Sequence, residues 1–490
     1  MISEQCDVSF FLQKLDNLTI IKLDNSEDLI EIPDLSRAPN LKILSLAYCV
    51  SLHQLHPSIF SAPKLRELCL KGCKKIESLI TNIHSKSLQR LDLTDCSSLV
   101  QFSVTSEEMT WLSLSGTTIH EFSSSMWRNS KLGLLNLSDC KKLNFVGKKL
   151  SNDRGLESLI YLNLSGCTQI NTLSMWFILD GARSLNHLNL RNCCNLETLP
   201  DNIQNCLMLE FLVLDGCVNL NSLPKLPASL RDLSAINCTS LDTNSIQREM
   251  LENMLYIICT KNHFRRVALS SLLPVAEVPC EFDFFTTEAS IITPPIPKDG
   301  LYDIVLCVLL SEGLNLTSSG FYCTIYNHGG IGFGWNIGSE HVSETMISDH
   351  VLLIRLTNFC YWARVDDDHY SISFEVGLYN DDGEQLSTKG IKGCGFILVS
   401  SLEHSLGLDG SSSRSKVEIV ELPFNAQVSN EFDQHSKFDD DENEDAQQQL
   451  LITPKENEED LNYKSSCDCS IGTNFQPLPN YKLYIYLFLV

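Results

Sequence analysis

Basic residues are scarce in this chain of 490 residues. The sequence has 37 Lys and Arg against 61 Asp and Glu, which gives a formal net charge of −24. A protein that binds nucleic acid regardless of its sequence needs a basic surface to displace counterions from phosphates, and attachment to anionic lipid needs one as well. The composition therefore argues against nucleic-acid partners and against membrane partners.

Long apolar runs are also lacking. The run at residues 483–490 is far shorter than the roughly 20 residues that a bilayer crossing needs. Residues 1–12 include Glu4 and Asp7 and lack the basic start and apolar core of a secretion signal. We expect a reducing, cytoplasmic or nuclear compartment, in which 20 cysteines do not form a disulfide framework.

The motifs of common catalytic sites are missing from the sequence. It contains no Gly-x-Ser-x-Gly nucleophile turn, no His-Glu-x-x-His zinc motif and no Gly-x-x-x-x-Gly-Lys-Ser/Thr phosphate loop, each of which positions reactive groups by its spacing. Cys467 and Cys469 form a lone Cys-x-Cys, which is a weak metal signal. We expect a protein that is not an enzyme and that holds no cofactor and no metal.

One phrase recurs throughout the first half of the chain: Leu-x-x-Leu-x-Leu-x-x-Cys. Its copies begin at Leu18, Leu41, Leu65, Leu88, Met109, Leu132, Leu159, Leu185, Leu209 and Leu230, of which the first, fifth and last are degenerate. The spacings of 21 to 27 residues are those of a leucine-rich repeat, which has roughly 20–29 residues. Each Leu-x-Leu core predicts a short strand, and stacked strands form a parallel sheet over a continuous leucine core.

Eight cysteines occupy the ninth position of the phrase, where the chain leaves the strand. A buried thiol suits this turn, because free cysteine is among the most buried residue types. Their separation of at least 21 residues is unlike a short-range zinc pattern. We expect a structural cysteine ladder, which comprises Cys49, Cys73, Cys96, Cys140, Cys167, Cys193, Cys217 and Cys238.

The third position of the phrase points away from the leucines and forms a column along the predicted sheet. Trp, Tyr and Arg dominate binding hot spots, and a contiguous exposed apolar patch indicates an interface. The candidate protein-binding residues on this concave face are Glu67, Arg90, Trp111, Tyr161, His187, Phe211 and Asp232, with Ile20, Ile43 and Leu134 in the same column. The alternative is that other parts of the chain cover these rings. The next outward column, from Lys22 to Ser234, is mostly small and polar, and we interpret it as an adaptable rim.

The repeat pattern occupies residues 18–243, after an N-terminal cap or linker over residues 1–17. A helical pattern between Ser245 and Arg266 predicts a capping helix and linker over residues 244–271. The predicted fold class so far is an α/β leucine-rich-repeat solenoid, or horseshoe.

Short apolar segments bounded by Gly, Pro, Asn and Asp predict an antiparallel β-sandwich-like domain over residues 272–401. Its expected strands are 304–310, 321–326, 351–356, 371–378 and 395–399. Residues 402–490 are expected to form a mostly disordered acidic tail, because residues 431–460 have twelve acidic residues against two lysines and little apolar surface.

Motifs that follow the repeats resemble a known family. Together with the cysteine-type repeats, they are similar to the C-terminal half of plant TIR–nucleotide-binding–leucine-rich-repeat disease-resistance proteins, including the post-repeat domain called C-JID. The motifs are Val275–Pro279, Thr286–Ser290, Ser348–Val351, Phe374–Val376 and Lys392–Phe396. The resemblance implies an intracellular sensor that binds a pathogen effector protein. It also implies TIR and nucleotide-binding domains supplied upstream or in trans, since this sequence has no phosphate loop.

A second interpretation stays open. A stand-alone adaptor, such as a substrate-recognition subunit of a ubiquitin ligase, or a truncated decoy could use the same horseshoe. The adaptor would need a docking helix near its start, for which residues 1–17 are too short.

Overall fold

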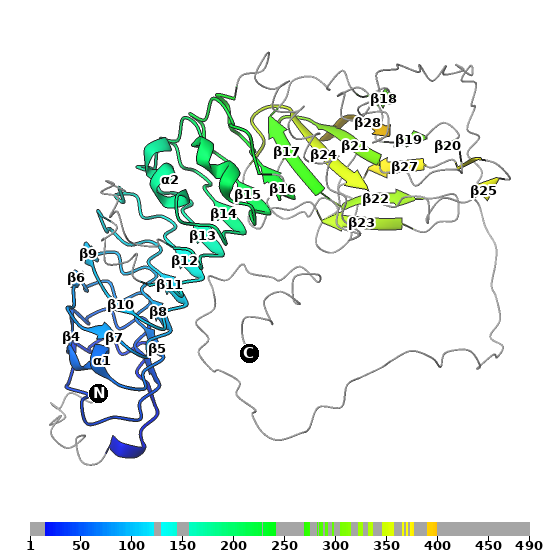
Figure 1. The fold of residues 1–490 in the computed structure, drawn as a ribbon. Coiled ribbons are helices and arrows are strands. Elements are labelled where there is room, and N and C mark those ends of the chain that lie inside the picture. Colours follow the sequence, from blue (N-terminus) through cyan, green and yellow to red (C-terminus); the bar gives the residue numbers. More distant parts are fainter. Residues whose placement is uncertain are drawn as a thin grey trace, which may run out of the picture. The chain divides into compact units, whose positions relative to one another are not determined.

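A computed structural model provides the fold of the chain, which Figure 1 shows as a ribbon. The structure describes residues 15–121, 129–144, 156–227, 229–241, 269–274, 282, 284–287, 290–292, 296–297, 304–314, 322–326, 332–336, 345–356, 365–366, 369–370, 373–376 and 390–398. All of these residues belong to one compact unit. The predicted capping helix and acidic tail lie outside the described residues.

Each of the ten repeats contributes one strand of three residues at the Leu-x-Leu core. The strands are β1 (Ile20–Lys22), β3 (Ile43–Ser45), β5 (Glu67–Cys69), β8 (Arg90–Asp92), β11 (Trp111–Ser113), β12 (Leu134–Asn136), β13 (Tyr161–Asn163), β14 (His187–Asn189), β15 (Phe211–Val213) and β16 (Asp232–Ser234). Neighbouring strands pair in parallel and in chain order (Figure 1). The predicted solenoid is therefore confirmed.

The return path of the coils has shorter elements. Three pairs of two-residue strands run in parallel: β2 (Glu31–Ile32) with β4 (Gln54–Leu55), β6 (Ser78–Leu79) with β9 (Gln101–Phe102), and β7 (His84–Ser85) with β10 (Thr105–Ser106). Among the described residues, the helical elements are α1 (Ser58–Ser61), α2 (Thr172–Leu179) and the 3-10 turns η2 (Leu15–Asn17) and η4 (Asp201–Asn205). Helix α2 begins after Asn171, whose Oδ1 accepts a hydrogen bond from the Ser174 amide at 2.9 Å.

The leucines of the phrase form one continuous core. Leu44, Leu91, Leu135 and Leu188, each at the middle of a strand, are at most 1% exposed. Because consecutive strands pair in register, each middle leucine stacks on the equivalent leucine of the next coil. The same cluster continues into apolar residues beyond the repeats, such as Leu273, Val305, Val351, Leu353 and Ile397.

The eight ladder cysteines are all buried and connect consecutive coils. Each thiol donates a hydrogen bond to the carbonyl oxygen of a leucine on the preceding coil, with sulfur–oxygen distances of 3.0 to 3.3 Å. The same carbonyl also accepts a hydrogen bond from an amide within its own turn. Leu46 O, for example, accepts one hydrogen bond from the Cys49 amide and one from the Cys73 thiol. Both lone pairs of the carbonyl are thereby used.

Thr117 replaces the cysteine in the repeat that begins at Met109. Its hydroxyl donates to Leu114 O of its own coil at 2.7 Å and lies 3.3 Å from the Cys140 thiol. The ladder thus has a hydroxyl in the fifth coil. The shorter side chain bonds within its coil instead of reaching back to the coil before it.

The eighth position of the phrase, directly before the ladder position, has a left-handed backbone in every repeat. This position is Asn, Asp or Gly in nine of the ten repeats, from Asn25 (φ 61°) to Asn237 (φ 58°), with Tyr48 as the exception. Asn, Asp and Gly tolerate this conformation best. The turn directs the amide of that residue at the next coil, as in Asn192 N–H to Asp215 O at 2.7 Å and Gly216 N–H to Ile236 O at 2.7 Å.

A histidine from the post-repeat region completes this series at the last coil. In the earlier repeats this amide donates to a carbonyl of the next coil. The Asn237 amide, in the last repeat, donates instead to His350 Nε2 at 3.1 Å. His350 Nδ1 lies 2.8 Å from Ser348 O, so Nδ1 carries the proton and Nε2 is free to accept. The Asn237 side chain adds two bonds to the same loop, to Thr345 O and from the Ile347 amide, both at 3.0 Å.

Strand β17 (Leu269–Pro274) continues the sheet of the repeats. It pairs in parallel with β16 and in antiparallel with β24 (His350–Leu356). The predicted domain boundary at residue 272 therefore lies inside a strand. The sheet then proceeds through β21 (Ile304–Leu310), β28 (Ile391–Leu398) and β18 (Phe284–Thr286).

The remaining strands form two smaller antiparallel sheets. One has the order β19 (Ser290–Ile292), β27 (Ser373–Val376), β22 (Tyr322–Tyr326), β23 (Gly332–Asn336), and the other has β20 (Ile296–Pro297), β26 (His369–Tyr370), β25 (Val365–Asp366). All five segments that the sequence predicts as strands overlap an observed strand, although β28 begins four residues before the predicted segment 395–399. Packing of two sheets face to face as a β-sandwich stays a prediction.

Two adjacent cysteines provide a matched test of the ladder. Burial raises the pKa of the Cys193 thiol well above its usual value, whereas Cys194 is half-buried beside it. Because the thiolate is the reactive form, we expect iodoacetamide to alkylate Cys194 well before Cys193 in the native protein. Peptide mapping by mass spectrometry after timed alkylation measures both rates, and equal native rates would contradict the ladder.

Substitution of His350 tests the connection between the last coil and the post-repeat sheet. His350→Leu removes the acceptor and leaves the buried Asn237 amide unpaired, so the free energy of unfolding should fall by about 1–3 kcal/mol. His350→Gln retains an acceptor oxygen and should lose less. Urea denaturation near neutral pH measures both variants, and a loss in His350→Gln as large as in His350→Leu would argue against the hydrogen bond.

The same histidine makes stability depend on pH. Burial lowers the pKa of His350, which the Ser348 carbonyl and the Asp349 charge offset in part. An unfolded histidine takes up a proton near pH 6.5, while the folded ring stays neutral to lower pH. Its stabilisation is thus present above about pH 6.5 and is lost as the pH falls below it. Between about pH 6.5 and 5, the free energy of unfolding should fall more for the unsubstituted chain than for His350→Gln. Equal decreases in the two proteins, measured by urea denaturation at each pH, would contradict this prediction.

Candidate functional site

The residues at the first position of each strand form one outward column across the sheet. The register aligns Glu67 with Arg90, Arg90 with Trp111, Tyr161 with His187, and so on to Asp232. The structure thus brings together all seven candidate residues, with Leu134 between Trp111 and Tyr161. We call these seven residues and Leu134 the column. Every side chain of the column is partly buried, so the rings are less exposed than the sequence pattern suggested.

A cation–π contact lies in the N-terminal half of the column. The guanidinium carbon of Arg90 lies 5.0 Å from the centroid of the Trp111 ring. A guanidinium over an indole face is attracted by the negative quadrupole of the ring. The contact holds both long side chains in one arrangement, which lowers the conformational entropy that a partner would have to remove.

Three rings stack in the C-terminal half of the column. Tyr161 and His187 have ring centroids 4.7 Å apart with an interplanar angle of 26°, and His187 and Phe211 have centroids 5.6 Å apart at 27°. Burial lowers the pKa of His187 to about 4. The imidazole is therefore neutral near pH 7, and the stack offers a mainly uncharged aromatic surface.

Carboxylates lie at both ends of the ring-bearing segment. Glu67 precedes Arg90 on the neighbouring strand, and Asp232 follows Phe211. Beside Asp232, Arg231 pairs with Glu210 at 3.1 Å. The column therefore runs from a charged end through aromatic rings to a second charged end, which suits a protein surface of mixed character rather than an anionic polymer.

The second outward column does not form the adaptable rim that the sequence suggested. Ser45, Cys69, Asp92, Ser113 and Ser234 are buried. Elsewhere in this column Asn side chains accept a hydrogen bond from the amide two residues ahead, as Asn163 Oδ1 does from the Ser165 amide at 2.9 Å. These short polar side chains shape the turn after the strand, because Asn, Asp and Ser readily bond to nearby backbone groups. They are not free to adapt to a partner.

Metal-ligating clusters and bilayer-spanning helices are two further features that concern the described residues. Within them, no group of three or more His, Cys, Asp or Glu side chains could hold a metal ion. None of their helices has the length and the apolar content that a bilayer crossing requires. Cys467 and Cys469 lie outside the described residues.

Sequence reasoning missed the contact between Asn237 and His350, although both are buried. The two residues are 113 positions apart, and His350 belongs to no periodic pattern. The only signal was the short motif Ser348–Val351, which the resemblance singled out without a role.

Comparison with curated proteins finds relatives among plant resistance proteins. The chain is 36% identical over 193 residues to Protein SUPPRESSOR OF npr1-1, CONSTITUTIVE 1 of Arabidopsis thaliana, covering 39% of this chain and 13% of that protein. It is 31% identical over 341 residues to Disease resistance protein RPP5 (68% and 20%) and 26% identical over 410 residues to Disease resistance protein RML1A (82% and 38%), both of Arabidopsis thaliana. The chain thus spans between 13% and 38% of the length of these relatives.

No family model matches the chain. Among solved structures, the leucine-rich repeat domain of the type III effector XCV3220 (XopL) is similar at 24% sequence identity with a TM-score of 0.28, covering 43% of this chain and 74% of that one. The repeats, their register and the sequence relatives agree with one another. The leucine-rich repeat region of this chain is homologous to that of plant disease resistance proteins.

Proposed function

We propose that the chain is the recognition portion of an intracellular plant immune receptor and that its column binds a pathogen effector protein. The observation that supports this most strongly is the column itself: an Arg–Trp pair and a three-ring stack on one continuous sheet. Arg, Trp and Tyr are the residues that most often supply binding energy at interfaces. The relatedness to disease resistance proteins supports the biological setting.

Preorganisation makes the column suitable for binding. Side chains that are already stacked lose little further rotamer freedom when a partner docks, so more of the contact energy appears as affinity. The strands that carry them are fixed by hydrogen bonds on both sides. We therefore propose a surface that binds with little rearrangement of the backbone.

The proposed mechanism is binding, not catalysis. In a complete receptor, an effector that binds one conformation better than another shifts the equilibrium between them. The nucleotide-binding and TIR domains, upstream or on a partner chain, would convert that shift into a signal. The proposed compartment is the cytoplasm.

A pair of tryptophan substitutions tests the proposal. Pairwise binding of the full chain to a panel of secreted pathogen effector proteins, measured by split luciferase in plant cells, identifies a bound effector. Trp111→Ala should then weaken that binding by at least about 30-fold, because hot-spot truncation costs about 2 kcal/mol or more. Trp176→Ala is the matched control, since Trp176 lies on α2 and is 37% exposed.

The two variants separate the outcomes. Binding that survives Trp176→Ala and fails in Trp111→Ala supports the column. Equal effects of the two substitutions, or none, would show that the effector binds elsewhere. A thermal melt of each variant checks that the repeats remain folded, since Trp111 is partly buried.

A further inference from the structure

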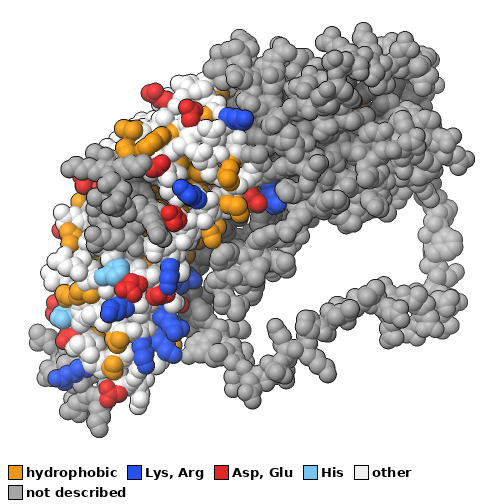
Figure 2. Space-filling model, in the orientation of Figure 1, with side chains coloured by type: hydrophobic (Ala, Val, Ile, Leu, Met, Phe, Trp, Pro, Cys, Tyr) orange, Lys and Arg blue, Asp and Glu red, His pale blue; other side chains and the backbone are white. Residues whose placement is uncertain are grey.

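A hollow lined by basic residues lies beside the start of the strands in the second to fourth coils. It has a volume of about 250 Å³ and is lined by Lys42, Pro63, Lys64, Arg66, Lys86, Ser87, Gln89 and Glu108. All four cationic side chains are exposed. Figure 2 shows Lys and Arg side chains gathered over this N-terminal part of the repeats. We call this hollow the basic pocket.

The positive charge of the basic pocket is largely uncompensated. Glu108, its one carboxylate, already pairs with Lys131 at 2.6 Å. The ion pairs found in the described ranges include no carboxylate partner for Lys42, Arg66 or Lys86. The Lys64 ammonium donates to a neutral group, Asn40 Oδ1, at 2.7 Å.

The stacking of coils forces these like charges together. Lys42 and Arg66 occupy the same phrase position on adjacent coils and precede paired strand residues. Neighbouring strands lie about 4.8 Å apart, so the cations of three coils share a short stretch of surface. Like charges at such distances repel, and a bound anion would relieve that repulsion.

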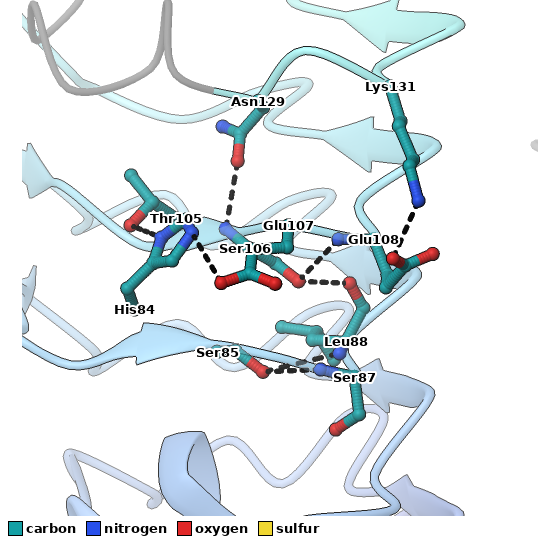
Figure 3. A network of polar contacts seen from close by, with 10 residues as sticks. All are labelled: His84, Ser85, Ser87, Leu88, Thr105, Ser106, Glu107, Glu108, Asn129 and Lys131. Carbon is teal, nitrogen blue, oxygen red and sulfur yellow. Dashed lines mark hydrogen bonds and ion pairs between the residues drawn. The ribbon is translucent and has the colours of Figure 1, made fainter.

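A polar network holds the wall of the basic pocket in place (Figure 3). Ser85 Oγ accepts from the amides of Ser87 and Leu88, at 3.4 and 3.2 Å. Ser106 Oγ donates to Leu88 O at 2.6 Å and accepts from the Glu108 amide at 3.2 Å. The backbone that carries Ser87 and Glu108 is therefore fixed, and Figure 3 shows Lys131 directed at Glu108.

We propose that the basic pocket binds a compact polyphosphate, either free or as the headgroup of a phosphorylated lipid. Four cations from three coils match several phosphate groups on a small scaffold, and the Arg66 guanidinium can bind phosphate oxygens bidentately. The Gln89 amide adds a neutral donor at the wall. This site uses none of the residues of the column, and the proposal does not rest on effector binding.

The charge of the whole chain selects for a compact ligand. At a net charge of −24, the remainder of the molecule repels long polyanions, whose charges extend beyond the pocket. A small polyphosphate places all its charge among the four cations. Exposed charges farther away than about 8–10 Å are screened at physiological salt, so the pocket acts on such a ligand as a local positive site.

Calorimetry with the full chain tests the proposal. Inorganic tripolyphosphate is the probe, in about 0.1 M salt, with inorganic phosphate as the comparison for charge number. We expect tripolyphosphate to bind and inorganic phosphate to bind much more weakly. The double variant Lys42→Gln/Lys86→Gln should weaken tripolyphosphate binding by at least about tenfold.

A charge-matched control distinguishes a site from general attraction. Lys74→Gln/Lys75→Gln removes two exposed lysines outside the basic pocket and should leave the affinity within about twofold. The proposal is overturned by an equal loss in both double variants or by no binding at about 1 mM probe. It is also overturned if an oligoglutamate peptide of equal charge binds as tightly as tripolyphosphate, which would indicate an acidic protein segment instead.

Two forms of the same headgroup distinguish the sources of the phosphate. Vesicles of phosphatidylcholine with phosphatidylinositol 4,5-bisphosphate are compared with soluble inositol 1,4,5-trisphosphate. Sedimentation of the chain with the vesicles, lost in Lys42→Gln/Lys86→Gln, supports a lipid headgroup. Binding of the soluble headgroup without sedimentation supports a free ligand.

Discussion

The open edge of each coil is the constraint on which the rest of this structure depends. The amide of the left-handed turn residue meets a carbonyl of the next coil, and the ladder thiol meets a carbonyl of the preceding one. A buried donor without a partner costs about 1–3 kcal/mol, so a coil is stabilised by neighbours in the same register. At the last coil the partners are Leu272 O on β17, which accepts from the Ala235 amide, and His350. The post-repeat sheet thus supplies acceptors that a further coil would otherwise supply.

The register that stacks the leucines also arranges the surface. Equivalent residues of adjacent coils lie about 4.8 Å apart, which falls within the 4.5–7 Å range of ring-centroid separations in aromatic pairs. Rings at the first strand position of consecutive coils therefore stack as a consequence of the backbone, as Tyr161, His187 and Phe211 do. Stacking against the neighbouring rings accounts for part of their burial.

The repeating phrase predicts the structural features that all coils share. The ten strands, the buried leucines and the position of the cysteines follow from period and alternation, since each coil presents the same problem to its neighbour. The outward direction of the column follows from the same alternation. Its degree of burial does not, because it depends on which side chains happen to be neighbours: Arg90 covers Trp111 only because they occupy adjacent coils.

The repeating phrase does not predict structural features that occur only once. Helix α2 lies in the part of its coil that has no fixed pattern, and His350 acts at a distance of 113 residues. The second outward column looked like a rim because Asn, Asp and Ser are polar, whereas their side chains are bound to the strand-end turns. The basic pocket combines residues from different phrase positions, and the net negative charge of the chain does not reveal a local cluster of cations.

The basic pocket and the column share coils, which relates their electrostatics. Arg66 immediately precedes Glu67, and Gln89 immediately precedes Arg90, so two residues of the pocket lead directly into the strands β5 and β8, which carry the charged end of the column. A polyphosphate in the pocket would make the local potential more negative and would favour basic over acidic partner groups near Glu67. Thermodynamic linkage requires the reverse as well: a partner with basic groups at that end would strengthen polyphosphate binding by the same factor. This coupling acts through charge, because β5 and β8, which adjoin both sites, are held in register by a neighbouring strand on each side.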